Sequence, residues 1–173
     1  PNSKRAFIEL KYGRIDLGWA ASYTDKRAKY VHFSDTYRTE VMRLYENTNN
    51  QHNVKNLEDI FKQGLTVGAN FGSYYGEEFE QYKTKYKKQI EYTSATSKRF
   101  EMLNKQRIDF AIEDELVGAH FGEKSTNIKL VTSIEYVNKD DIYLMFSKNT
   151  VSVTELAVIN EYINKNKTAL KAL

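Results

Sequence analysis

Three short polar segments carry the side chains best suited to binding chemistry. They read WAASYTDKR at 19–27, FGSYYG at 71–76 and EDE at 113–115. Each follows an apolar run that predicts a strand, and each precedes or enters a predicted helix. In α/β proteins, ligands bind where strands give way to helices, because backbone N–H groups point outward there. We refer to the three stretches as the candidate binding segments.

The side chains in these segments complement a zwitterion. Arg27 can grip a carboxylate with its planar two-pronged guanidinium, and the Ser22 hydroxyl can donate to the same oxygens. Gly72 allows close backbone approach, and Ser73 is expected to cap the helix that follows. Asp114 can pair with an ammonium group. The combination predicts a clamp for an α-amino acid or a related small carboxylate.

Simpler structural roles remain open for each of these residues. An arginine after Thr-Asp-Lys, such as Arg27, is more commonly a surface charge of a helix, and an aspartate after a strand, such as Asp114, is more commonly a helix cap. Trp19 is more often a core residue than an aromatic wall for a ligand. It is the occurrence of all these groups at strand ends that favours the clamp.

Composition limits the class of protein. The chain has 173 residues, of which 28% are charged and 40% hydrophobic, so one large globular domain or two small lobes are allowed. There is no run of about 18 apolar residues that could span a bilayer. No apolar signal-peptide core follows the first five residues, so the signal of an exported protein would be absent from this chain.

Several kinds of site are excluded or disfavoured. There is no cysteine, which excludes disulfides, thiolate metal sites and cysteine nucleophiles. The three histidines lack the spacing of metal ligands, and we expect neither a metal nor another cofactor. A net charge of +3 with interspersed signs, and a lysine cluster at 83–88 that fits a helix end, argue against a nucleic-acid partner.

An internal repeat indicates how the elements are arranged. Residues 7–16 read FIELKYGRID and residues 100–109 read FEMLNKQRID, with Phe, Leu, Arg, Ile and Asp matched at a constant offset of 93. In both copies Phe and Leu share a helical face, a polar turn follows, and an apolar strand begins at Ile. The pattern predicts a duplicated helix–turn–strand unit.

Strands and helices are expected to alternate along the rest of the chain. Asn56 is expected to cap a short helix. Strands are predicted at 15–18, 41–45, 65–71, 108–112 and 142–147, and helices at 75–88, at 96–105, after Asp114 and from Thr154. This alternation predicts an α/β protein with largely parallel sheets.

Three motifs resemble a known family in order and spacing. They are GRIDLGWAASYTDKRAKYVHFSDTY at 13–37, FKQGLTVGANFGSYYGEEFE at 61–80 and RIDFAIEDELVGAHF at 107–121. They are similar to bacterial extracellular solute-binding protein family 3, the periplasmic substrate-binding proteins of polar amino acid ABC transporters. The resemblance implies a two-lobe, type II periplasmic-binding-protein-like fold that is α/β in class.

The resemblance also implies lobe boundaries. Lobe 1 would comprise 1–37 plus 137–173 and lobe 2 would comprise 40–133, with hinge segments near 36–39 and 132–136. Compared with the family, lobe 1 would be incomplete, because a strand–helix–strand unit is missing before Pro1. That unit is where family members place groups that contact the ligand side chain.

Roles for individual residues follow from the resemblance. Arg27 would hold the α-carboxylate with help from Ser22 and the backbone near Ala20, Ser73 would meet the same carboxylate, and Asp114 would bind the α-ammonium. Trp19, Ala20 and Tyr74 depart from the family's usual small or hydroxylated residues. The implied ligand-binding set is Trp19, Ala20, Ser22, Arg27, Gly72, Ser73, Tyr74 and Asp114.

The resemblance further implies an ABC permease as partner, a periplasmic location and a monomeric full-length form. Two alternatives stay open on the same fold. One is an enzyme similar to cyclohexadienyl dehydratase, for which Glu113 or Glu115 would have to act as a general acid. The other is a ligand-sensing module.

Overall fold

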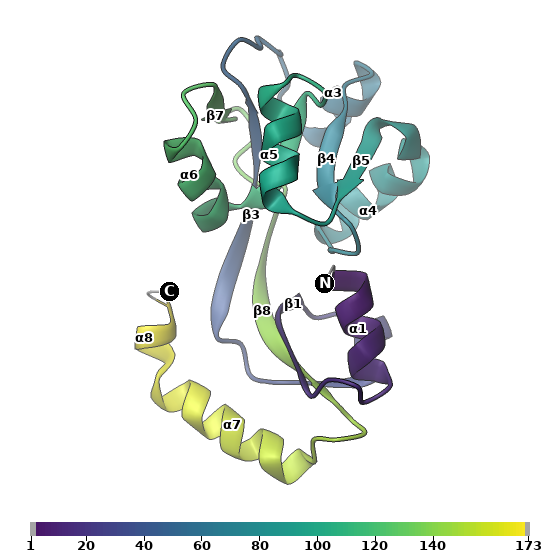
Figure 1. Cartoon of the computed structure of the whole chain (residues 1–173), viewed down its shortest axis with the longest axis vertical. Helices are drawn as coiled ribbons and strands as arrows, with labels where there is room; N and C mark the ends of the chain where they lie inside the picture. Colours follow the sequence, from purple (N-terminus) through teal and green to yellow (C-terminus); the bar gives the residue numbers. More distant parts are fainter. Residues whose placement is uncertain (1–2, 172–173) are drawn as a thin grey trace. The chain divides into compact units, whose positions relative to one another are not determined.

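The computed structural model describes residues 3–171, with side chains described through residue 169. The chain divides into two compact units (Figure 1). Unit 1 comprises Ser3–Glu40 and the chain from Asp140 onward, and unit 2 comprises Val41–Lys139. Residues 1, 2, 172 and 173 of predicted lobe 1 lie outside the described residues. Among those described, no helix has the length and apolar character needed to cross a membrane.

Two long strands run from one unit into the other. They are β3 (Arg38–Asn47) and β8 (Asn138–Ser147), and each contributes residues to both units. Within unit 2 the Val137 N–H donates to the Met42 carbonyl at 2.7 Å. Within unit 1 the Thr39 hydroxyl donates to Asp141 at 2.8 Å. A hinge at these segments stays a prediction.

Unit 2 alternates strands and helices between the two long strands. Its other elements are α3 (Leu57–Lys62), β4 (Val67–Asn70), α4 (Gly76–Lys85), the 3-10 turn η1 (Lys87–Gln89), β5 (Ile90–Thr93), α5 (Thr96–Asn104), β6 (Phe110–Asp114), α6 (Glu115–Glu123) and β7 (Ile128–Leu130). Helix α3 is capped as predicted, because the Asn56 side chain accepts from Asp59 N–H at 2.9 Å.

The sheet pairing is mixed, so the prediction of largely parallel sheets is wrong. Strand β4 pairs in parallel with β5 and β6, but β3 pairs antiparallel with β6 and β7, and β8 pairs antiparallel with β1 and β2. The helical crossovers of unit 2 produce its parallel pairs. The long strands β3 and β8 run antiparallel to the strands with which they pair. The alternation of strands and helices along the sequence does not indicate these strand directions.

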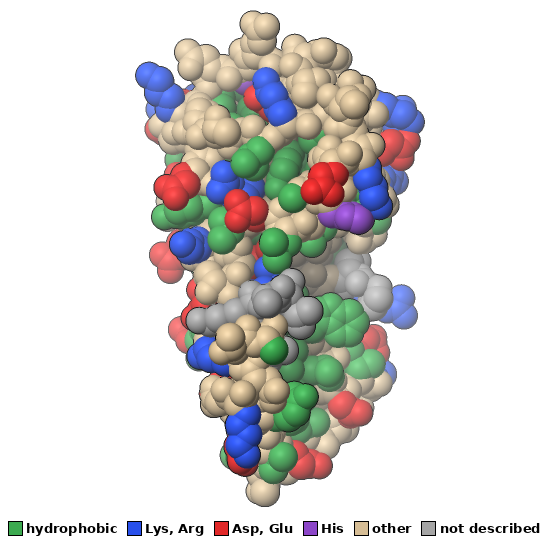
Figure 2. All heavy atoms as spheres, turned by 90° about the vertical axis from the view of Figure 1, so that its left-hand side faces the viewer, with side chains coloured by type: hydrophobic (Ala, Val, Ile, Leu, Met, Phe, Trp, Pro, Cys, Tyr) green, Lys and Arg blue, Asp and Glu red, His purple; other side chains and the backbone are tan. Residues whose placement is uncertain are grey.

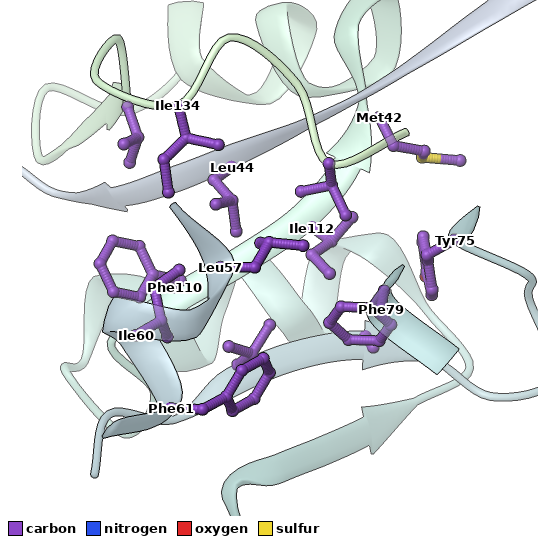
Figure 3. Packing of buried hydrophobic residues seen from close by; sticks show 14 of the residues in the cluster. Met42, Leu44, Leu57, Ile60, Phe61, Tyr75, Phe79, Phe110, Ile112 and Ile134 are labelled. Carbon is purple, nitrogen blue, oxygen red and sulfur yellow. The ribbon is translucent and has the colours of Figure 1, made fainter. Parts of the chain in front are cut away.

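Alternation along the strands places helices on both faces of unit 2. On β3, Leu44 faces α3 and α4 while Tyr45 faces α5, and on β6 the neighbours Phe110 and Ala111 divide in the same way. Figure 3 shows the first cluster, in which side chains of α3 and α4 converge on Leu44, Phe110 and Ile112. The two hydrophobic clusters hold the strand ends in place.

Unit 1 is built around β8. Its other elements are α1 (Ser3–Lys11), β1 (Leu17–Ser22), α2 (Asp25–Ala28), β2 (Val31–Phe33), α7 (Val153–Lys165) and α8 (Lys167–Lys171). Strands β1 and β2 both pair antiparallel with β8. Leu10, Ala21, Val31 and Met145 form a buried cluster between α1 and the strands.

The predicted helix–turn–strand repeat is confirmed in α1–β1 and α5–β6, although each strand begins two residues after the matched isoleucine. The two copies share the same helix end. Gly13 and Gln106, which are 93 residues apart, both have positive φ, at 68° and 52°. Their N–H groups donate to Leu10 and Leu103 carbonyls at 3.0 Å, and the next N–H in each copy reaches back five residues at 2.9 Å. This is the Schellman arrangement, in which a left-handed residue ends the helix.

Exchanging the residues at these two helix ends is expected to change stability in opposite directions. Gln106→Gly should raise the free energy of unfolding by about 0.5–1 kcal/mol, because glycine adopts the left-handed region without the clash of a Cβ. Gly13→Gln should lower it by at least about 1 kcal/mol. A Cβ at Gly13 would also come within 3.1 Å of Asn149. Urea unfolding tests both, and a destabilised Gln106→Gly variant would contradict the assigned turn.

Candidate functional site

The first candidate binding segment begins on β1 rather than after a strand at 15–18. Gly18 pairs with Met145 and Ala21 with Tyr143, so Trp19 and Ala20 together oppose a single residue of β8. This bulge puts Ala20 at φ 53°, and its N–H donates to the Tyr37 hydroxyl at 3.1 Å. Backbone strain of this kind is found at ligand-binding segments. The predicted strand was placed too early because Ile15 is apolar, although it lies in the turn.

Trp19 is not a core residue. The residue is 75% exposed, the largest exposed fraction among the exposed large hydrophobic residues of the described chain. The bulge turns it outward, so the interpretation of Trp19 as core is wrong and its aromatic face is presented to solvent.

Ser22 and Arg27 are brought together in unit 1. Thr24 caps α2, its hydroxyl accepting from Arg27 N–H at 3.2 Å. Arg27 Nη1 then donates to the Ser22 carbonyl at 2.9 Å, at the end of β1. The half-buried guanidinium is therefore fixed beside the strand end rather than extended from a helix surface.

The second candidate binding segment follows β4. Gly72 has φ 89°, a conformation that favours glycine, and lets the chain turn after Asn70. Asn70 Nδ2 donates to Ser73 Oγ at 2.8 Å, while Asn70 N–H donates to the Tyr75 hydroxyl at 2.7 Å. Tyr74 between them is half-buried. The Asn70 side chain thus holds Ser73 at the strand end.

The prediction that Ser73 caps the next helix is wrong. Helix α4 begins at Gly76, and the residue before it, Tyr75, makes no side-chain cap bond. Tyr75 instead lies buried in the core, where its hydroxyl accepts from Asn70 N–H. Burial raises the pKa of this hydroxyl to about 12. With Ser73 bound to Asn70, its hydroxyl oxygen lies over the end of β4.

The third candidate binding segment joins β6 to α6. Asp114 is 3% exposed, and its Oδ1 accepts from Leu116 N–H at 3.2 Å and Val117 N–H at 3.3 Å. The helix-cap interpretation of Asp114 is therefore confirmed.

The parallel strands of unit 2 end on one edge of the sheet. Asn70 ends β4, Thr93 ends β5 and Asp114 ends β6, and these three strands run in the same direction. Ligands of α/β sheets bind beyond such carboxyl ends. Ser73, which follows β4, and Asp114, which ends β6, are therefore placed by strands that end at the same edge.

The two acids proposed as general acids are held by arginines. Glu113 is buried and forms an ion pair with Arg99, while Glu115 pairs with Arg43 at 3.1 Å. Tyr45 donates to the Glu115 carbonyl at 3.3 Å, and burial raises the pKa of Tyr45 to about 12. Both acids that the dehydratase alternative would need as general acids are therefore paired with arginines in this structure.

Other chemistry finds no support in the described residues. No group of three or more histidine, aspartate or glutamate side chains among residues 3–171 could hold a metal ion. Figure 2 shows acidic and basic side chains interspersed over the visible face rather than gathered by sign. On this face the charges form no basic stripe of the kind found at a nucleic-acid interface.

Three residues near these segments were not predicted from the sequence. Asn70 holds Ser73, Tyr37 holds the Ala20 amide, and Arg99 holds Glu113. Asn70 could have been identified by its place at the end of a predicted strand. Tyr37 and Arg99 lie 17 residues after Ala20 and 14 residues before Glu113, and no local pattern links either pair.

Comparison with known proteins gives matches among solved structures. No protein-family model and no curated protein matches the chain. A mutant of ArgBP from T. maritima matches with a TM-score of 0.82 and 20% identity, covering 98% of this chain and 70% of that chain. An ancestral arginine-binding protein bound to glutamine has a TM-score of 0.79 and 22% identity, covering 96% and 72%.

A third match is AbpA from Streptococcus pneumoniae, an amino acid ABC transporter substrate-binding protein bound to L-arginine. It has a TM-score of 0.79 and 18% identity, covering 98% of this chain and 69% of that chain. At these identities the likeness shows the fold. The predicted two-lobe α/β fold of the periplasmic-binding-protein type II class is thereby confirmed.

Proposed function

We propose that this chain is a substrate-binding protein of an amino acid ABC transporter. It binds an α-amino acid or a similar small carboxylate through groups that both lobes contribute. The observation that carries the proposal is the Arg27 guanidinium fixed beside Ser22 at the end of β1, in a fold shared with amino-acid-binding proteins. A bidentate arginine is well suited to a planar carboxylate.

Each lobe has a separate part in recognition. In lobe 1, Arg27 and Ser22 bind the α-carboxylate, and the backbone near Ala20, at the bulge of β1, assists them. In lobe 2, Ser73 meets the same carboxylate and Asp114 pairs with the α-ammonium. Gly72 permits close backbone approach, while Trp19 and Tyr74 supply aromatic surface.

The transport role places the protein outside the cytoplasm, with an ABC permease as its partner. ArgBP and AbpA are reported with arginine, and the ancestral protein is reported with arginine or glutamine. L-Arginine and L-glutamine are therefore the first compounds to test. No observation favours a catalytic role.

Calorimetric titration against each of the twenty common L-amino acids tests the proposal. For each amino acid that binds, the matched 2-oxo acid, which lacks the ammonium group, and the matched amine, which lacks the carboxylate, serve as controls. Both are expected to bind at least about tenfold more weakly, because each loses a charge-assisted contact. Binding of no amino acid would refute the proposal, and turnover of prephenate would indicate the enzyme instead.

Asp114→Asn is expected to separate the two roles of Asp114. Asparagine caps helices as well as aspartate, so the free energy of unfolding should change by less than about 0.5 kcal/mol. Loss of the negative charge should weaken binding of the amino acid about tenfold or more, while the 2-oxo acid should bind as before. Titration of both compounds, with urea unfolding alongside, measures the two effects. Equal loss for the amino acid and its 2-oxo acid would contradict the assigned role.

A further inference from the structure

A buried ion pair lies directly beneath the carboxyl end of β6. Arg99 of α5 is 2% exposed and Glu113 of β6 is 9% exposed. Their side chains are joined by a hydrogen bond from Arg99 Nη2 to Glu113 Oε2. The proposed ligand contacts do not use either residue.

The pair is connected to the main chain of Asp114. Glu113 Oε1 accepts the Asp114 N–H at 3.1 Å, while its other oxygen is bound to Arg99. On the far side, Arg99 Nη1 donates to Thr93 Oγ1 at 3.1 Å and Nη2 contacts Thr96 Oγ1 at 3.4 Å. A continuous set of hydrogen bonds therefore runs from the end of β5 to Asp114.

Stability alone does not account for this arrangement. A buried ion pair is commonly no more stable than apolar side chains of similar volume, because both charges lose their hydration. Here Arg99 Nε has no hydrogen-bond partner among the described residues, which adds to the cost. A Cβ at Gly68 would lie 2.5 Å from Ile108 Cδ1 and 3.1 Å from Arg99 Cγ, so this glycine makes room for both side chains. Apolar side chains could fill this space at a lower cost in free energy. The ion pair is therefore expected to have a further role, which is to fix the geometry of the groups bonded to it.

We propose that Arg99, acting through Glu113, is a positioning residue for Asp114. This inference rests on the proposed function, in which Asp114 binds the α-ammonium of an amino acid. Arg99 neutralises Glu113, so that a second buried carboxylate beside Asp114 carries no unpaired charge. Glu113 in turn fixes the main chain at Asp114 and with it the direction of the capping carboxylate.

Two double variants separate positioning from packing. R99M/E113M fills the space with apolar side chains but removes the acceptor for Asp114 N–H. R99M/E113Q is equally uncharged but keeps an amide oxygen as that acceptor. The wild type and both variants are titrated with each of the twenty L-amino acids and with the 2-oxo acid of every one that binds, and urea unfolding is recorded.

The expected result is a selective loss of affinity. R99M/E113M should bind the amino acid about tenfold more weakly than wild type, while its affinity for the 2-oxo acid changes less than about threefold. R99M/E113Q should regain most of the amino acid affinity. Equal binding by wild type and R99M/E113M, or equal weakening for both compounds, would overturn the positioning role. A wild type that binds no amino acid would refute the proposed function and this inference together.

A third variant covers the case in which R99M/E113M does not fold. Arg99→Lys keeps the positive charge beside Glu113 but lacks the planar fork that also reaches Thr93 and Thr96. It should reduce the ratio of amino acid affinity to 2-oxo acid affinity by at least about threefold. An unchanged ratio would overturn the inference.

Discussion

Replacing Arg27 with alanine is expected to weaken amino acid binding at least about a hundredfold, which corresponds to about 2.7 kcal/mol. The guanidinium is the group proposed to bind the α-carboxylate, and removing it leaves the ligand's negative charge without its partner. Its bond to the Ser22 carbonyl at 2.9 Å fixes the side chain before ligand arrives, so little ordering cost offsets the contact. Calorimetric titration of the best-binding amino acid measures the loss.

Two matched variants make this result specific. Lys26→Ala removes a neighbouring exposed positive charge from the same short helix and should change affinity less than about threefold. Arg27→Lys keeps the charge but not the bidentate fork, and should fall between alanine and wild type. Thermal unfolding of all three checks that unit 1 stays folded. An Arg27→Ala protein that is folded and binds normally would remove the basis of the proposed function.

Replacing Gly118 with alanine is expected to destabilise unit 2 by about 3 kcal/mol. A Cβ at this position of α6 would lie 2.2–2.3 Å from two ring carbons and the hydroxyl oxygen of Tyr45, far inside contact distance. Tyr45 is 4% exposed and packs against Phe100 with ring centroids 5.4 Å apart, so the ring cannot move away without disturbing the core. Overpacking of this kind outweighs the gain in helix propensity of about 1 kcal/mol.

Gly122 provides a control within the same helix. A Cβ there meets nothing within 4 Å, so Gly122→Ala should leave stability unchanged or raise it by up to about 1 kcal/mol. Urea unfolding compares the two variants. Adding Tyr45→Leu to Gly118→Ala should recover part of the loss, because the smaller side chain makes room for the methyl group. A Gly118→Ala protein as stable as wild type would show that α6 does not pack on Tyr45 this closely.

Local features of the structure could be predicted well from the sequence. The Asn56 cap, the repeat and the helix after Asp114 were each expected from a few neighbouring residues, and each is present. Such features depend on backbone propensity and on hydrogen bonds within one turn, so the necessary information lies within a short stretch. Part of the order of strands and helices follows for the same reason, but the short elements α2, β2 and β5 were not predicted.

Features set by distant partners could not be predicted. Ser73 would satisfy the rule for a helix cap, but the Asn70 side chain takes its hydroxyl and Tyr75 moves the helix start to Gly76. Trp19 would satisfy the rule for a core residue, but the bulge opposite β8 turns it outward. In both positions a tertiary contact outweighs a local preference.

The sequence by itself determined the α/β class, the candidate binding segments and the identities of the charged groups. These follow from residue type and spacing, which remain the same however the chain folds. Only the tertiary structure decided that the sheet is mixed, that Arg27 is tied to Ser22, and that Glu113 is paired with Arg99. Strand direction and the pairing of buried charges depend on which segments meet in space, and that is fixed by the packing of the whole core.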